Sequence, residues 1–166
     1  MTGHALFDTA IGQCGVAWGP SGITAAWLPG ARRTGSPAKP PPAVAEAIRR
    51  ITALLAGEKD DLRDIALDPA GVPEFHLRVY EVTRAIPVGD VLTYGEVARR
   101  VGQPGSAQAV GRALGRNPFP PIVPCHRVMG ADGRMVGFSA PGGTTTKLRM
   151  LAIEGAADPY GQEALF

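Results

Sequence analysis

Glycine and proline divide this chain into short segments, which limits the folds that it can adopt. They account for 22 and 16 of its 166 residues, so turns and loops are expected to be frequent, without the period of a collagen. Hydrophobic residues make up 45%, which is enough for a packed core. No apolar run approaches the roughly 18 residues of a membrane span, and no signal segment is expected. We expect one domain of ordinary size, or two small domains packed together.

The first half of the sequence predicts a small sheet followed by one helix. The first thirty residues resemble strands, and apolar residues alternate on either side of a turn at 19–22, which is typical of a β-hairpin. Helical spacing follows in 44–55, with Pro42 near its start and Gly57 just past its end. The polar, turn-rich stretch 57–73 is the predicted domain boundary.

The second half predicts mainly helices. One apolar stripe indicates a helix over 75–86 that Pro87 ends, and a short extended piece follows at 91–92. A last helix is expected over 147–153, after a glycine- and threonine-rich stretch at 139–146 that we expect to be a mobile loop.

Two short helices between these elements are a candidate helix-turn-helix. Thr93 and Glu96 have the spacing of a capping box at the start of the first helix. After a turn, Ser106 is expected to cap a second helix over 107–114. Residues 97–131 contain five arginines and no Asp or Glu, although the net charge of the chain is only +2. This stretch favours an anionic partner, and a solvated basic surface is the alternative.

Cys125 is the candidate reactive residue. The chain has one other cysteine, Cys14, so a disulfide framework is excluded and a reducing cytoplasm is expected. Cys125 lies between Pro124 and His126, after a proline-rich stretch at 120–124 that we expect to be buried, rigid and strand-like. A cysteine reacts as the thiolate, so a nearby base has to lower its pKa. Neighbours in an extended segment point to opposite faces, so His126 needs a backbone bend or a bridging water to act on the thiol. An inert, buried cysteine is the alternative.

The segment around Cys125 resembles the active-site signature of the O6-alkylguanine-DNA alkyltransferases. The resemblance rests on Asn-Pro at 117–118 and Pro-Ile-Val-Pro-Cys-His-Arg-Val at 121–128. It extends to the segment 86–98, to Ala-Val-Gly at 109–111, to Gly-Phe-Ser at 137–139 and to 147–155. It is close over 74–155 and loose over 1–73. The resemblance implies a DNA repair protein that takes the alkyl group of O6-alkylguanine, and by extension of O4-alkylthymine, onto its own cysteine in one irreversible step.

The resemblance also implies roles for individual residues. Cys125 would be the nucleophile, His126 the base acting through water, and Glu154 the group that orients His126. Asn117 would brace the turn beneath the site, and Tyr94 would give a proton to the leaving guanine. The Ser139 amide would contact O6, Phe138 would form part of the pocket wall, and the carbonyls of Cys125 and Val128 would accept from the guanine amine. The expected DNA contacts are small residues that approach the minor groove and arginines that bind phosphates: Ala107, Ala109, Gly111, Arg112, Arg116 and Arg127.

Three features depart from the family pattern. Gln108 stands where the family usually has an arginine that fills the gap left by the flipped base. Phe138 replaces a tyrosine, and the stretch 139–147 is longer than in short family members. Gln108 therefore favours single-stranded or distorted DNA, and it supports the alternative of a lesion-binding or divergent protein that does not repair.

The expected architecture has two packed parts. An α/β part over 1–70 supports a mainly helical part over 72–155, which carries a winged-helix-like helix-turn-helix and the site, and a tail follows over 156–166. No cofactor is expected, because the cysteine itself accepts the alkyl group. His4, Cys14 and His76 lack the compact spacing of a structural metal site, so no metal is expected. We expect a monomer that binds DNA and no membrane.

Overall fold

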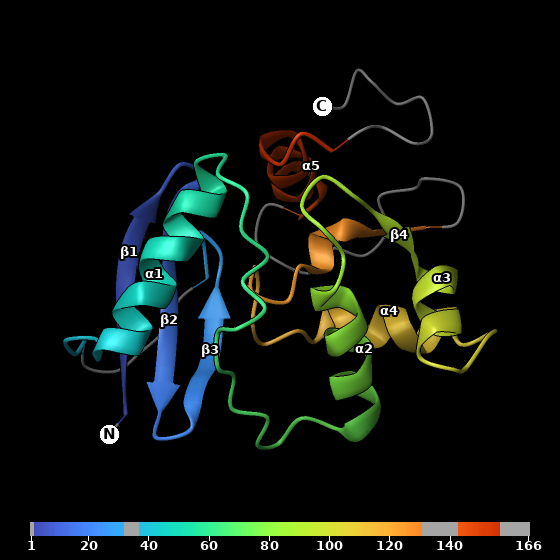
Figure 1. Cartoon of the computed structure of the whole chain (residues 1–166), viewed down its shortest axis with the longest axis horizontal. Coiled ribbons are helices and arrows are strands. Elements are labelled where there is room, and N and C mark those ends of the chain that lie inside the picture. The colour runs from blue at the N-terminus through green and yellow to red at the C-terminus, as the bar shows by residue number, and fades with distance from the viewer. Residues whose placement is uncertain (1, 32–36, 131–142, 157–166) are drawn as a thin grey trace.

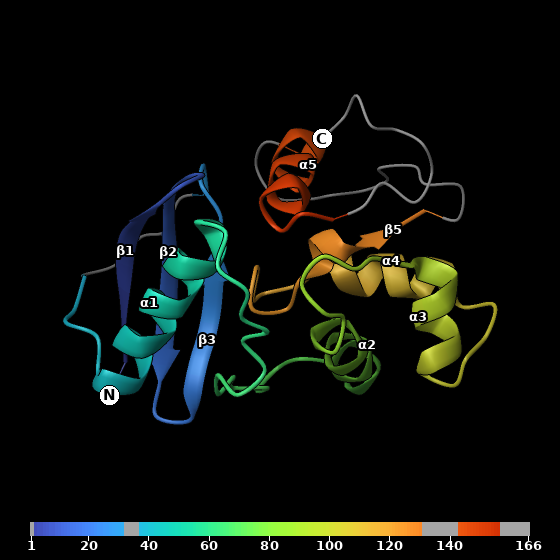
Figure 2. The same ribbon diagram turned by 45° about the horizontal axis from the view of Figure 1, so that its top comes forward.

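The computed structural model describes residues 2–31, 37–130 and 143–156. Figure 1 shows a sheet with one helix beside a group of helices, and the turned view of Figure 2 keeps this separation. The elements of the first group are β1 (Gly3–Thr9), β2 (Gly12–Gly19), β3 (Gly22–Trp27) and α1 (Pro42–Leu55). Those of the second are α2 (Glu74–Arg84), β4 (Leu92–Thr93), α3 (Tyr94–Arg100), α4 (Ala107–Gly115), the 3₁₀ turn η1 (Cys125–Arg127), β5 (Val128–Met129) and α5 (Gly143–Ile153). No described helix has the length and apolar character needed to cross a membrane.

The sheet is antiparallel, in the order β1-β2-β3. The predicted hairpin is confirmed as β2 and β3, which pair Gly19 with Gly22 across the turn. The helix α1 buries Val44, Ala47 and Ile51 on one face, as its apolar spacing predicts. It begins at Pro42, two residues before the predicted start, because proline at the first helical position lacks only a donor that would have no partner there.

The predicted helices of the second half are present, with different ends. The helix α2 stops at Arg84, and Ala85 and Ile86 form a turn before Pro87. The last helix begins at Gly143 rather than Lys147, so the end of the stretch expected as a loop is helical. The rest of that stretch, 139–142, lies outside the described residues.

The helix-turn-helix is present as α3 and α4. Thr93 Oγ1 accepts from the Glu96 amide at 3.1 Å, and Glu96 Oε1 accepts from the Thr93 amide at 3.0 Å, so the predicted capping box is confirmed. The expected Ser106 cap is wrong. Its hydroxyl donates back to the Gln103 carbonyl and makes no side-chain cap for α4.

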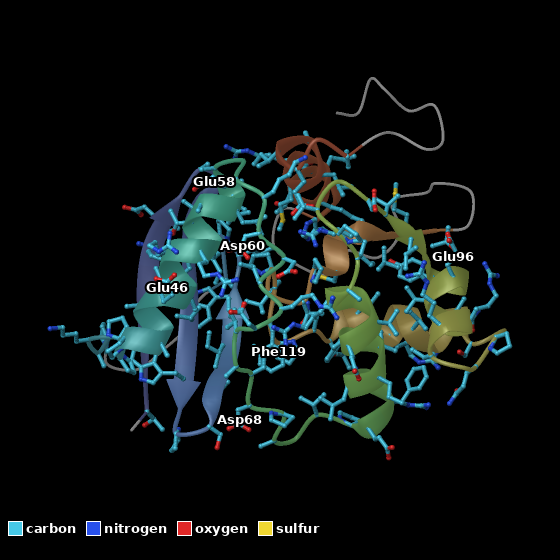
Figure 3. All side chains as sticks on the ribbon, in the orientation of Figure 1. Glu46, Glu58, Asp60, Asp68, Glu96 and Phe119 are labelled. Atoms are coloured by element: carbon cyan, nitrogen blue, oxygen red, sulfur yellow. The ribbon has the colours of Figure 1, made fainter. Side chains whose placement is uncertain are left out.

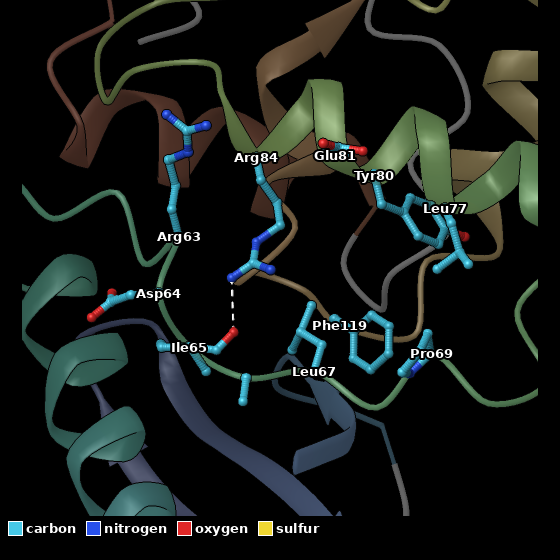
Figure 4. Close-up of a pocket in the computed structure, with 11 residues that line it drawn as sticks. Arg63, Asp64, Ile65, Leu67, Pro69, Leu77, Tyr80, Glu81, Arg84 and Phe119 are labelled. Carbon is cyan, nitrogen blue, oxygen red and sulfur yellow. Dashed lines mark hydrogen bonds between the residues drawn. The ribbon is translucent and has the colours of Figure 1, made fainter. Parts of the chain in front are cut away.

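Hydrogen bonds join the two groups of elements. The Ala26 amide of β3 donates to the Pro118 carbonyl at 2.8 Å, and Arg149 of α5 donates to the Ala10 carbonyl at 2.6 Å. Arg84 of α2 donates to the carbonyls of Leu62 and Ile65 in the connecting segment, where it lines a cleft of about 520 Å³ (Figure 4). The buried Phe119 lies between β3 and α2 (Figure 3).

Candidate active site

Cys125 lies on a tight turn rather than in an extended segment. Residues 121–124 are buried, as expected, but the stretch 120–124 forms turns and not a strand. The turn η1 begins at Cys125, and the Arg127 amide donates to the Pro124 carbonyl at 2.9 Å. This is the backbone bend that the Cys-His sequence requires. The strand β5 follows at once and pairs in parallel with β4, which places the turn beside the helix-turn-helix.

Asn117 holds the backbone that leads into this turn. Its Nδ2 donates to the Val123 carbonyl at 2.8 Å, and its Oδ1 accepts from the Phe119 amide at 2.9 Å. Both ends of the side chain amide therefore hold backbone of the segment that leads into Cys125, which agrees with the bracing role implied by the resemblance. A further hydrogen bond from Asn117 to the Cys125 side chain favours the thiolate.

His126 and Glu154 form a buried pair. His126 Nε2 lies 2.9 Å from Glu154 Oε2, and both side chains are almost fully buried. Burial lowers the pKa of His126, and Glu154 opposes that effect. Burial also opposes ionisation of Glu154, but its hydrogen bonds with Arg127 and His126 outweigh burial and lower the pKa of Glu154 to about 2. Glu154 is therefore a carboxylate that can orient the imidazole.

The DNA-contacting role expected for Arg127 is wrong. The residue is 1% exposed, and its Nε and Nη2 donate to the two carboxylate oxygens of Glu154, each at 2.8 Å. Its Nη1 donates to the Ile86 carbonyl at 2.8 Å. A guanidinium inside the protein cannot reach a phosphate on the surface. The neighbouring sequence Cys-His-Arg did not show this, because both partners lie far away in the chain.

Cys125 remains partly accessible. Burial raises the pKa of its thiol, while the Asn117 hydrogen bond and the positive charge of Lys147 lower it. Reactivity of Cys125 therefore depends on neighbours that stabilise the thiolate against desolvation.

Lys147 is a buried cation at the candidate site that the sequence did not single out. It lies in α5, is 1% exposed, and donates through Nζ to the Val128 carbonyl at 2.6 Å. Burial lowers the pKa of Lys147 to about 8, and Cys125 has the opposite effect. A signal was available, because Lys147 shares one helical face with the buried Met150, Leu151 and Glu154. The Val128 carbonyl, expected to accept from the guanine amine, thus already accepts one hydrogen bond, and a carbonyl oxygen has two lone pairs.

Tyr94 is the first residue of α3 and is about half-buried. Burial and the nearby Cys125 both raise the pKa of its phenol. The Tyr94 phenol is therefore protonated at neutral pH. Phe138 and Ser139, expected in the substrate pocket, lie outside the described residues.

The outer face of α4 carries the other expected DNA contacts. Val110, Ala113 and Leu114 are buried against the core, whereas Gln108 and Arg112 are exposed on the helix and Arg116 is exposed just after it. The small residues expected to approach DNA are partly exposed: Ala107, Ala109 and Gly111. A methyl group added at Gly111 would meet no atom within 4 Å. Arg99 and Arg100, at the end of α3, are exposed as well.

The fold and the site define a class of protein with a partly accessible cysteine on a tight turn, a buried histidine–carboxylate pair and an adjoining helix-turn-helix. A family model described as "6-O-methylguanine DNA methyltransferase, DNA binding domain" matches residues 74–156. The methylated-DNA–protein-cysteine methyltransferases of Methanothermobacter thermautotrophicus and Mycobacterium leprae are each 40% identical to this chain, over 93% of it and over 83% and 84% of their own lengths. A crystal structure of Mycobacterium tuberculosis OGT in complex with DNA is 34% identical, with a TM-score of 0.79, and the match covers 93% of this chain and 96% of that one.

The chain belongs to the methylated-DNA–protein-cysteine methyltransferase family. The match to Mycobacterium tuberculosis OGT also confirms the predicted fold class, an α/β part packed on a mainly helical part with a helix-turn-helix. Among the described residues, no group of three or more His, Cys, Asp or Glu side chains is placed to hold a metal ion.

Proposed function

We propose that this protein repairs DNA by transferring the alkyl group of O6-alkylguanine to Cys125. The observation that carries the proposal is the partly accessible Cys125 thiol on a turn beside a helix-turn-helix, next to the His126–Glu154 pair. The relatives named as methylated-DNA–protein-cysteine methyltransferases support the same reaction.

The proposed reaction is a displacement at carbon. The His126 imidazole takes the Cys125 proton through a water, and Glu154 orients the ring. The thiolate attacks the alkyl carbon, so a carbon–sulfur bond forms while the bond between that carbon and O6 breaks. The electron pair of the broken bond passes to guanine, and the Tyr94 phenol supplies a proton so that the base leaves neutral. The product thioether is stable, so each chain reacts once.

The alkylated base has to leave the duplex to reach Cys125. We propose that α4 enters the minor groove with its small residues, and that Arg112 and Arg116 bind phosphates on either side. Gln108 would occupy the gap left by the flipped base, without the charge of an arginine. By the resemblance to the family, the Ser139 amide would contact O6 and Phe138 would form part of the pocket wall.

We further propose the division of labour expected from the sequence. Residues 1–70 support residues 72–155, which bind DNA and react, and 156–166 is a tail. The protein acts as a monomer, because one protein molecule meets one lesion. It needs no cofactor, because the cysteine itself accepts the alkyl group. Its few cysteines favour the reducing cytoplasm.

Intact-mass spectrometry tests the reaction directly. The protein is mixed with a duplex that contains one O6-methylguanine, and the expected result is a gain of one methyl group per chain without turnover. Cys125→Ser should gain nothing, whereas Cys14→Ser, which removes the buried cysteine of β2, should still react. An unchanged mass together with tight binding of the modified duplex would favour a lesion-binding protein and overturn the proposal.

A further inference from the structure

Arg127 is a buried charged group to which the proposed reaction gives no role. Its guanidinium makes a two-pronged ion pair with Glu154 through Nε and Nη2, and its third nitrogen is held by the Ile86 carbonyl. The side chains of Arg127 and Glu154 are each 2% exposed. Burying such a pair costs desolvation free energy that its attraction does not reliably recover, so stability alone is a weak reason for it.

One oxygen of Glu154 serves two donors. Glu154 Oε2 lies 2.8 Å from Arg127 Nη2 and 2.9 Å from His126 Nε2. A guanidinium always donates, so the carboxylate in this pair is ionised and can only accept. The proton between His126 and Glu154 therefore belongs to Nε2, and Nδ1 of the neutral ring is the nitrogen with a free lone pair.

The charges around His126 act in opposite senses, and Arg127 and Lys147 oppose Glu154. The groups that face it among the described residues are Glu154, Arg127 and Lys147, which sum to one positive charge when Lys147 is protonated. A proton on His126 would add a second positive charge to a buried site. Burial has the largest effect and lowers the pKa of His126. Glu154 raises that pKa through its charge and its hydrogen bond, and the charges of Arg127 and then Lys147 lower it. Without Arg127 the carboxylate would be free to stabilise an imidazolium.

We infer that Arg127 is a positioning residue, which neutralises Glu154 so that His126 stays uncharged, with its proton on Nε2 and its lone pair on Nδ1 available to the thiol. The inference rests on the proposed function for its consequence in the reaction, but the state of His126 can be measured without DNA. A purely structural Arg127 would change the stability of the chain and leave the titration of His126 where it was.

Nitrogen-15 NMR of the imidazoles tests the charge state in the full chain. His126 is compared in the wild type, in Arg127→Gln, which keeps hydrogen-bond donors but removes the charge, and in Arg127→Lys, which keeps the charge. In Arg127→Gln we expect His126 to titrate about one pH unit or more higher, and in Arg127→Lys within a few tenths of the wild type. Equal titration of His126 in the wild type and Arg127→Gln would overturn the inference.

A double variant provides a second test in case Arg127→Gln alone does not fold, because that single change leaves the buried Glu154 carboxylate without its cation. Arg127→Gln combined with Glu154→Gln removes both charges of the pair at once, and His126 should then titrate as low as in the wild type. A high titration in the double variant would also overturn the inference. Arg84→Gln is the matched control, because Arg84 donates only to backbone carbonyls in the cleft, and it should leave His126 unchanged.

The rate of alkyl transfer gives the second readout. In Arg127→Gln we expect a rate a few-fold lower near pH 7 that recovers as the pH rises and His126 loses its extra proton. A loss of the same size at every pH would count against the inference. If the wild type transfers no alkyl group, the proposed function fails, and the NMR comparison still decides the role of Arg127.

Discussion

The positive charge of the buried Lys147 favours a Cys125 thiolate, and its removal gives a first prediction at the scale of one residue. Lys147→Met should slow alkylation of Cys125 by iodoacetamide by about tenfold, because the pKa of the thiol rises by about one unit. The wild-type pKa of Lys147 is about 8, so the ratio of the wild-type alkylation rate to that of Lys147→Met should be largest below pH 8, where Lys147 is charged, and smaller above it. Lys59→Met on the exposed surface is the control. Equal rates for Lys147→Met and the wild type would contradict the prediction.

Gly15 in β2 tests packing at the same scale. The Trp27 indole lies over it, and a Cβ at position 15 would sit 2.2 Å from two ring atoms. Gly15→Ala should therefore lower the free energy of unfolding by about 1–3 kcal/mol, as overpacking of a core does. Gly115→Ala in α4 meets no atom within 4 Å and should be neutral or stabilising by up to about 1 kcal/mol. Urea unfolding of both variants is the measurement, and a Gly15→Ala protein as stable as Gly115→Ala would count against this packing.

At the scale of elements, α4 presents Gln108 to the proposed DNA groove. Gln108→Arg should raise the rate on a duplex with one O6-methylguanine several-fold, because a charged side chain fills the gap of a flipped base better. The rate on the single-stranded form should change little, since no base has to leave a stack. Gln103→Arg, in the turn before α4, adds the same charge elsewhere and is the control. An equal gain in that control would assign the effect to net charge rather than to position 108.

The capping box at the start of α3 is formed by residues that are close in the sequence. Thr93 and Glu96 are three residues apart, and their two hydrogen bonds need no other part of the chain, so the prediction from the sequence was right. The prediction failed at α4 because the Ser106 hydroxyl had a second local partner, the Gln103 carbonyl. Residues 120–124 formed turns instead of a strand, because Asn117 holds Val123 and Phe119 in place.

At the scale of the whole molecule, Glu154 links the site to stability. Its pKa is about 2 in the folded chain, against an ordinary value of 4.5. A lowered carboxylate pKa stabilises the folded state above pH 4.5, and this contribution, about 3 kcal/mol, is lost as the pH falls from 4.5 to 2. Urea unfolding between pH 2 and pH 7 should show this loss. In Glu154→Gln, the part of the pH dependence of the free energy of unfolding that comes from Glu154 should be absent. The same pH dependence in both proteins would contradict the link.

Local patterns in the sequence determined the hairpin, the faces of the helices and the helix-turn-helix, and they singled out Cys125 as a candidate, because each of these depends on residues only a few positions apart. Resemblance to a known family added the pairing of His126 with Glu154. The tertiary structure alone decided that Arg127 is buried, since its partners lie 27 residues after it and 41 before it. It also decided that the buried Lys147 donates to the Val128 carbonyl and that its charge lowers the pKa of the Cys125 thiol. A charge enters a protein interior only where compensating groups meet it, and those groups come together when distant elements pack.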